Sequence, residues 1–253
     1  PKMVYGGGIV EFATIQEGIK YKEPINLMDV DLHVQEGYGC VTTVSGGLDY
    51  SQRDIQVVQR ASHDGICLRD FNKKYTGQTE VGAGAYGETF ASLTAYSDAL
   101  VAKFRKSNEE FIWKATTAVN GVDGLGTLLS SATTGIVVPG SAAAITTANA
   151  LEQIDLLLQD MSVDVQNRED IIVAMSVTNF NKYLVALRNA NFYHFAPEDM
   201  KTLAGGRAAK HPFYPNVTVI GTVGLQGSEK VIAGPASEIV IGTDTMSDLT
   251  AGA

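Results

Sequence analysis

The sequence predicts an α+β fold, and three observations support this. The segment 88–115 contains neither glycine nor proline and repeats large apolar residues at helical spacing. Several short β-branched runs, most of them near the C-terminal end, are stopped by a glycine, which is typical of strands. Helical and strand-like segments come in blocks and do not alternate regularly, so we do not expect a parallel α/β sheet.

The composition and charge limit the classes of function. The chain has 253 residues, of which 45% are hydrophobic, enough for a sizeable core in one large or two small domains. Its net charge is −9, so the chain lacks the excess of basic residues that neutralises nucleic-acid phosphates, and we expect no sequence-specific nucleic-acid binding. No apolar run reaches the roughly 18 to 20 residues that span a bilayer, and the N-terminus has no signal-peptide pattern, so we expect no membrane partner and no export.

The first sixty residues predict strands and a long loop. The alternation of Val30, Leu32 and Val34 has the period of two that a half-buried strand shows. The runs "CVTTV" and "DIQVVQR" predict two further strands, and "SGGLDYSQ" between them predicts their connection. Residues 40–60 are therefore expected to form a long hairpin or an extended loop.

A long helix is predicted over residues 88–115. Its apolar residues, among them Leu100 and Phe104, recur at spacings near 3, 4 and 7. At 1.5 Å per residue this helix would be roughly 40 Å long. An Asn-Gly and an Asp-Gly pair within residues 120–124 predict turns, and the segment 130–149, rich in Ser, Thr, Ala and Gly, predicts a surface connection.

The second half of the chain predicts two more helices and a buried strand. The first of these helices would begin at Thr147 or Asn149, either one as its cap, and end at Met161. The fully apolar run "IIVAMSV" suits a buried strand, and Thr178 after it has the place of a cap for the next helix. Three runs near the C-terminal end predict strands of one sheet, namely "VTVIGT", "KVIAG" and "EIVIGT".

One glycine-rich stretch suggests nucleotide chemistry. "VGAGAYGETF" has the spacing G-x-G-x-x-G, at Gly82, Gly84 and Gly87, which in a dinucleotide-binding fold cradles a pyrophosphate. Such a loop follows a buried apolar strand directly, whereas "KKYTGQTEV" precedes Gly82 and holds a single aliphatic residue. We favour a flexible entry into the long helix, because glycine relaxes backbone restrictions. A nicotinamide or flavin site is the less favoured alternative.

No other constellation of catalytic or metal-binding residues is expected. The four histidines are scattered without metal-ligand spacing, so each is interpreted as a surface or hydrogen-bonded side chain. They are His33, His63, His194 and His211. Cys40 and Cys67 are interpreted as free thiols, ahead of a disulfide or a metal site. Since G-x-S-x-G and P-loop motifs are missing too, we predict a protein that is not an enzyme, with no catalytic, cofactor-binding or metal-binding residues.

Two further motifs have structural interpretations. "NANFYHFAPEDM" places four aromatic rings before Pro197, which favours a buried loop anchor over a ligand platform. The sequon that begins at Asn216 matters only in a secreted chain. Neither motif changes the expectation of a protein without an active site.

The order of the motifs resembles that of a known family. Residues 107–132, "SNEEFIWKATTAVNGVDGLGTLLSSA", place the end of a long helix before an Asn-Gly turn and a Gly-Leu-Gly-Thr-Leu-Leu segment. A helix follows in "ITTANALEQIDLLLQDM", and a buried strand with its helix follows in "DIIVAMSVTNFNKYLVALRNA". A Leu-x-Gly-Gly turn then precedes a Pro-bearing strand in "MKTLAGGRAAKHPFYPNVTVIG", and the final sheet strands lie in "EKVIAGPASEIVIGTD". This succession resembles the major capsid proteins of tailed bacteriophages, which have the Hong Kong 97 type fold. The first part, from "GIKYKEPINLMDVDLHVQEGYGC" to "ICLRDFNKKY", is most similar to capsid proteins of crAss-like gut phages.

The resemblance implies a division into domains. Residues 1–39 would form an N-terminal arm, residues 40–80 an extended, hairpin-like loop, residues 81–144 the peripheral domain with its spine helix at about 88–115, and residues 145–253 the axial domain. Family members usually return after the axial domain to add strands to the peripheral sheet, whereas this sequence stops at "MSDLTAGA". We therefore expect those C-terminal peripheral strands to be absent.

The resemblance also implies a structural function. The chain would be a major capsid subunit that assembles with copies of itself into the pentamers and hexamers of an icosahedral phage head around double-stranded DNA. Portal and minor capsid or decoration proteins would be further partners, and the location would be the virion, after assembly in the host cytoplasm. An encapsulin-like compartment shell is an alternative on the same fold. A nucleotide-binding enzyme that uses Gly82, Gly84 and Gly87 is the alternative from another class.

Overall fold

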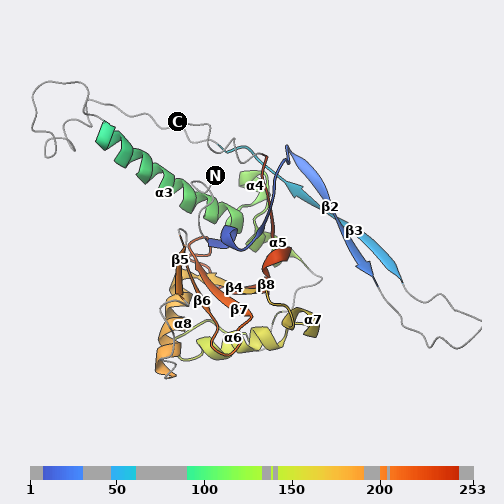
Figure 1. Ribbon diagram of the computed structural model, residues 1–253, viewed down its shortest axis with the longest axis vertical. Helices are drawn as coiled ribbons and strands as arrows, with labels where there is room; N and C mark the ends of the chain where they lie inside the picture. Colours follow the sequence, from blue (N-terminus) through green and yellow to red (C-terminus); the bar gives the residue numbers. More distant parts are fainter. Residues whose placement is uncertain are drawn as a thin grey trace, which may run out of the picture.

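The structure, a computed structural model, has the mixed α and β content that the sequence predicts (Figure 1). It describes residues 8–30, 47–60, 90–132, 138, 142–190, 200–203 and 206–244. The helical elements are η1 (Gly8–Glu11), α3 (Phe90–Lys114), α4 (Thr117–Asn120), α5 (Leu125–Ser131), α6 (Ala150–Gln159), α7 (Val163–Gln166), α8 (Val177–Asn189) and η4 (Ala236–Glu238). The strands are β1 (Thr14–Gln16), β2 (Lys22–Val30), β3 (Leu48–Gln56), β4 (Ile171–Ser176), β5 (Met200–Leu203), β6 (Gly206–Lys210), β7 (Val217–Thr222), β8 (Ile232–Pro235) and β9 (Val240–Gly242).

A five-stranded sheet in the order β5-β6-β7-β4-β8 forms the centre of the body. β4 and β7 pair in parallel, and the other neighbours in this sheet are antiparallel. Every residue of β4 is buried, which confirms the buried strand predicted from "IIVAMSV". Because successive side chains of a strand point to opposite faces, Val173 and Met175 enter one core, and Ile172 and Ala174 enter another.

The sheet is covered on both faces, so the body has three layers. On one face lie α6 and α8, the two helices predicted for this half, with Ile154, Phe180 and Leu187 in the shared core. On the other face lie η1 and the C-terminal end of α3, which bury Ile9 and Trp113. Figure 1 shows α6 and α8 on the side of the sheet away from α3.

The predicted long helix is confirmed as α3. Its 25 residues correspond to about 37 Å at 1.5 Å per residue. Near its end Glu109 and Trp113 are almost completely buried, whereas Leu100 and Phe104 are only partly buried. Figure 1 shows the N-terminal part of α3 extending away from the sheet. Residues 88–89, which the sequence also assigned to this helix, lie outside the described residues.

The Asn-Gly and Asp-Gly pairs after α3 form the predicted turns. Gly121 ends α4 with a φ of 77°, in the left-handed region that glycine favours. Gly124 precedes α5 and lies so close to α3 that a Cβ there would be 2.8 Å from the carbonyl carbon of Trp113. The Asp123 carboxylate accepts the Thr117 N–H at 2.6 Å. These contacts fold α5 back against the end of the long helix.

The long hairpin differs from the prediction. β2 pairs antiparallel with β3, from Lys22 opposite Gln56 to Val30 opposite Leu48. β3 begins inside "SGGLDYSQ" and continues through it, so the assignment of this stretch to a connection was wrong. The run "CVTTV" lies outside the described residues. The physical reason for the error is that β3 is exposed on both faces, so it lacks the alternation of buried and exposed residues by which a strand is recognised.

The caps of two helices also differ from the prediction. α8 follows β4 directly, and its cap is Ser176, whose Oγ accepts the Asn179 N–H at 3.2 Å. The prediction of Thr178 as the cap was wrong, because the helix begins before it and Thr178 lies in the first turn. At α6, Asn149 has the predicted cap position, but its Oδ1 accepts the Thr146 N–H at 2.7 Å and caps no helix N–H.

Replacing the true cap should cost more stability than replacing the predicted one. Ser176→Ala is expected to lower the free energy of unfolding by about 1 kcal/mol, because a helix N–H loses its acceptor. Thr178→Ala should cost less than about 0.5 kcal/mol, because this exposed hydroxyl only accepts a bond from Gln226. Urea unfolding followed by circular dichroism measures both. Equal losses in the two variants would contradict the assignment of Ser176.

Two of the three C-terminal runs predicted for one sheet belong to it. They form β7 and β8, the neighbours of β4. The third run forms β9, which pairs in parallel with β1, Thr14 opposite Val240, so its assignment to the same sheet was wrong. The short helix η4 separates β8 from β9 and takes the chain out of the central sheet. A strand pair from opposite ends of the described chain therefore completes the body.

Candidate functional site

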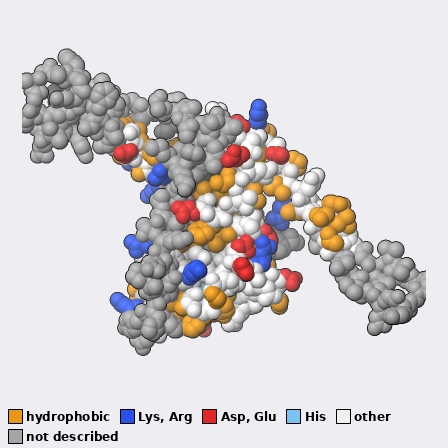
Figure 2. All heavy atoms as spheres, in the orientation of Figure 1, with side chains coloured by type: hydrophobic (Ala, Val, Ile, Leu, Met, Phe, Trp, Pro, Cys, Tyr) orange, Lys and Arg blue, Asp and Glu red, His pale blue; other side chains and the backbone are white. Residues whose placement is uncertain are grey.

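The hairpin β2–β3 exposes apolar side chains at its outer end. Residues directly opposite each other in an antiparallel ribbon lie on the same face, and here Met28 is opposite Tyr50 and Val30 is opposite Leu48. The exposed fractions of these four residues are 62%, 69%, 56% and 51%. Figure 2 shows hydrophobic side chains gathered at this end of the hairpin. We call these four residues the hairpin cluster.

The inner half of the hairpin is polar and is attached to the body. Lys22 and Asp54, on the same face as the hairpin cluster, form an ion pair with an N to O distance of 2.7 Å. At the base, Ile55 packs so closely on β9 that a Cβ at Gly242 would lie 2.5 Å from its Cγ2. The hairpin is therefore held at its base and exposed at its outer end.

Arg60 joins the segment after the hairpin to the long helix. Its guanidinium donates to Asn108 Oδ1 at 2.8 Å and to Ser107 Oγ at 3.0 Å. The same group lies 4.4 Å from the centre of the Phe111 ring, within the range of a cation–π contact. Partial burial lowers the pKa of Arg60 from its ordinary value. The hairpin base and the middle of α3 thus form one connected unit.

Glu109 is a buried carboxyl group that connects three elements. Its Oε1 accepts the Ile9 N–H of η1 at 3.2 Å, the Trp113 Nε1–H at 3.1 Å and the Thr222 hydroxyl of β7 at 2.5 Å. Burial raises the pKa of Glu109, although these hydrogen bonds favour the charged form. Gly8 has a φ of 66°, in the left-handed region that glycine favours, and a Cβ there would lie 2.3 Å from Oε1. Glu109 therefore has a structural role at the joint between α3 and the sheet.

A second buried polar group lies between α6, α8 and the turn after β6. The His211 side chain is fully buried, and its Nδ1 accepts the Phe213 N–H at 3.3 Å, so Nε2 carries the hydrogen of the neutral ring. Nε2 lies 4.0 Å from Asp155 Oδ1, which is too long for a hydrogen bond. The Tyr183 ring stacks on His211 at a centroid distance of 6.1 Å. Burial lowers the pKa of His211 to about 4, so the ring is neutral at pH 7.

Acid is expected to destabilise the fold through His211. The pKa of about 4 in the folded chain lies below the ordinary value of 6.5, so between these values the unfolded chain binds more protons. The neutral His211 ring contributes its full stabilisation above about pH 6.5. As the pH falls from 6.5 to 4, the free energy of unfolding decreases by about 3 kcal/mol through this group. Urea unfolding of the wild type and of His211→Asn at pH 7 and near pH 4 measures it.

His211→Asn keeps a hydrogen-bond acceptor for Phe213 but does not titrate in this range. Its free energy of unfolding should fall by about 2 to 3 kcal/mol less than that of the wild type over the same pH interval. Nearby Asp155, whose pKa is raised by burial, is present in both proteins, so the difference between them reports the loss of the histidine. Equal losses would show that His211 does not contribute.

Several residues singled out by the sequence lie outside the described residues. They are the glycines of "VGAGAYGETF", Cys40, Cys67, His33, His63, and His194 with its aromatic neighbours. Asn216 of the sequon is described, and its Nδ2 donates to the carbonyl oxygens of Arg168 at 2.7 Å and Gln166 at 3.0 Å. That amide nitrogen therefore holds the turn before β4. Sequence reasoning missed the hairpin cluster, although an alternation of apolar residues is present at the end of each strand.

Comparison with protein-family models, with curated proteins and with solved structures finds no match to this chain. Among the described residues, no group of three or more His, Cys, Asp or Glu side chains is placed to hold a metal ion. None of the helices in the described ranges is both long and apolar enough to cross a lipid bilayer. The function is therefore inferred from the geometry and charge of the chain itself.

Proposed function

We propose that this protein is a structural subunit that assembles with copies of itself into a closed shell, as the major capsid subunit of a tailed bacteriophage with a Hong Kong 97 type fold. The observation that carries the proposal is the hairpin cluster, a group of exposed apolar residues on a ribbon that stands away from the body (Figures 1 and 2). Apolar residues gathered on an exposed surface are typical of an interface. A two-stranded ribbon is marginally stable alone and gains stability when a partner buries one face. In a shell, a neighbouring subunit supplies that face.

The positions of the two projections favour a ring over a simple pair. Figure 1 shows α3 and the hairpin leaving the body on different sides. A contact between the hairpin cluster of one copy and the partly buried residues of α3 in the next, such as Leu100 and Phe104, joins two different surfaces. Such heterologous contacts repeat from copy to copy and form rings where the rotation closes. The pentamers and hexamers of an icosahedral head are rings of this kind.

The proposal assigns a place to each part of the chain. The hairpin β2–β3 is the extended loop, so this loop takes in Lys22–Val30, which the sequence assigned to the N-terminal arm, together with part of the range 40–80. α3 is the spine helix, and the central sheet with α6 and α8 is the axial domain. Double-stranded DNA inside the head, location in the virion, and contacts with portal and minor capsid or decoration proteins follow from the capsid assignment. The net charge of −9 suits a wall that does not retain packaged DNA. The proposal includes no active site, cofactor or metal.

Negative-stain electron microscopy of the freshly purified protein, at low and high concentration, tests the proposal. Closed shells or rings are expected at high concentration. A uniform monomer at every concentration would contradict it. The content of purified particles distinguishes the two kinds of shell, since nuclease-protected DNA indicates a phage head and a defined protein cargo indicates an encapsulin-like compartment.

A further inference from the structure

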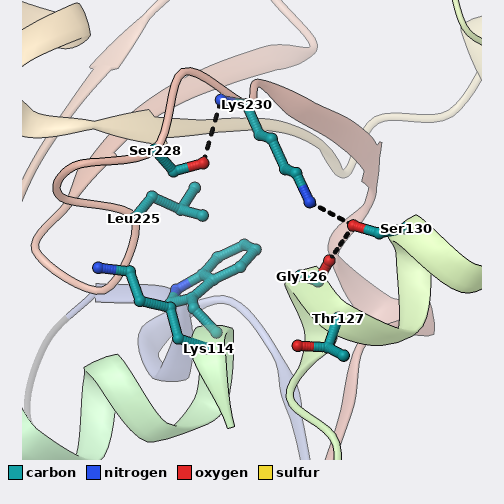
Figure 3. A pocket seen from close by; sticks show the side chains of 8 residues that line it. Lys114, Gly126, Thr127, Ser130, Leu225, Ser228 and Lys230 are labelled. Carbon is teal, nitrogen blue, oxygen red and sulfur yellow. Dashed lines mark hydrogen bonds between the residues drawn. The ribbon is translucent and has the colours of Figure 1, made fainter. Parts of the chain in front are cut away.

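A depression lies where the end of α3, α5 and the loop between β7 and β8 meet (Figure 3). Its volume is about 330 Å³, and Trp113 and Leu225 supply its apolar lining. Figure 3 shows Ser130 of α5 on one side and Leu225 on the other, with Lys230 reaching across to Ser130. A Cβ at Gly126 would lie 2.8 Å from the Trp113 carbonyl oxygen, so α5 packs closely against the end of α3. The depression is thus a concave surface between closely packed elements.

Among the residues that the structure describes, two ammonium groups at this depression have only neutral partners. Lys114 Nζ donates to the Gln226 carbonyl oxygen at 2.5 Å, and Lys230 Nζ donates to Ser130 Oγ. In the described part of the chain, no carboxylate forms an ion pair with either lysine. Each ammonium has three donors, so both keep donors for a further acceptor. In a chain with 28 acidic and 19 basic residues, this pattern favours an anionic partner.

The hairpin carries the complementary charge. The register places Asp29 directly opposite Asp49, on the face that does not carry the hairpin cluster. The Asp49 side chain is exposed, so its carboxylate is available to a cation from a partner. Leu27, on the same face, is 39% exposed. The exposed carboxylate of Asp49 matches a depression that has two lysines at its edge.

We infer that the depression binds the acidic face of the hairpin of a second copy, with Asp49 of one copy paired with Lys230 of the other. The inference rests on the proposed self-assembly and names the receptor site for the hairpin. Each hairpin strand has nine residues and spans about 30 Å, so the outer end lies beyond the body that carries it (Figure 1). The two faces of the hairpin then contact different surfaces in the assembly, one apolar and one basic.

A charge exchange tests the pairing. The variants are Lys230→Glu, Asp49→Lys and the double variant, with Lys210→Glu as a control at an exposed lysine of β6. Each single variant should reduce the assembled fraction at a fixed protein concentration by about tenfold or more, the double variant should recover to within about threefold of the wild type, and the control should assemble normally. Circular dichroism verifies that every variant is folded. Single variants that assemble like the wild type, or a double variant no better than either single one, would overturn the inference.

A binding measurement separates this inference from the proposed function. Trp113 is the only tryptophan of the chain and lines the depression, so a full-length Trp113→Phe protein can supply the hairpin without fluorescence of its own. Adding this protein to the dilute wild type should change the Trp113 fluorescence saturably and more weakly at high salt, and should have no effect on Lys230→Glu or when the added protein also carries Asp49→Lys. No change at high concentrations of the added protein would overturn the inference even if shells form. Saturable binding without any assembly of the wild type would instead overturn the proposed function and support the depression as the hairpin site.

Discussion

Tyr50→Asp is expected to abolish assembly and to leave the subunit folded. Tyr50 is 69% exposed in the subunit, so its replacement removes no core contact. In the proposed interface the same position becomes buried, where an unpaired charge costs several kcal/mol. Because every subunit of a shell repeats the contact, no closed particle should survive. Size-exclusion chromatography and electron microscopy measure assembly, and circular dichroism measures folding.

The sequence offers a matched control for this variant. Tyr21 is 67% exposed and lies just before β2, at the base of the hairpin and away from the hairpin cluster. Tyr21→Asp introduces the same charge at a tyrosine of the same exposure and should assemble like the wild type. Normal assembly of Tyr50→Asp would show that the hairpin cluster is not an interface. Equal failure of both variants would show that the effect is one of charge and not of position.

Trp113→Ala is expected to lower the free energy of unfolding by about 3 to 5 kcal/mol. The indole is 1% exposed and lies in the core with Ile9 and Leu225, so its removal leaves a large cavity. It also removes the Nε1–H that Glu109 accepts at 3.1 Å, and the carboxylate of Glu109 is already disfavoured by burial. Urea unfolding followed by far-ultraviolet circular dichroism measures the loss, because the variant has no tryptophan to follow by fluorescence.

Trp113→Phe separates the two contributions at this site. Phenylalanine keeps most of the apolar volume and lacks the N–H donor, so its cost should be about 1 to 2 kcal/mol. A cost below about 1 kcal/mol for Trp113→Ala would contradict the view that this contact holds α3 on the sheet. A loss of stability in Trp113→Phe nearly as large as that in Trp113→Ala would assign most of the loss to the hydrogen bond with Glu109.

The helices and the buried strand could be predicted because their signals are local. α3 follows from a long run of helical spacing without glycine or proline, and β4 follows from a short run that is apolar throughout. The details at element ends were less predictable. Both Ser176 and Thr178 are residues that cap helices well, and only the point at which β4 ends decides between them.

The pairing of strands could not be predicted from the same patterns. β9 has the β-branched run of a sheet strand, yet its partner is β1, more than two hundred residues earlier. β3 has exposed residues on both faces, and the apolar alternation of Leu48 and Tyr50 at its outer end was too short to indicate its pairing with β2. The hairpin cluster exists only in that register, because a shift by one residue would send apolar side chains to both faces.

The sequence alone determined the α+β class, the long helix, the buried strand and the acidic net charge, all of which depend on composition or on neighbours within a few turns. The tertiary structure decided how these parts meet. The carboxylate of Glu109 accepts hydrogen bonds from Ile9 and Thr222, residues 100 and 113 positions away. The hairpin cluster likewise joins residues of two strands. Contacts of this kind depend on the packing of distant segments, which local periodicity does not encode.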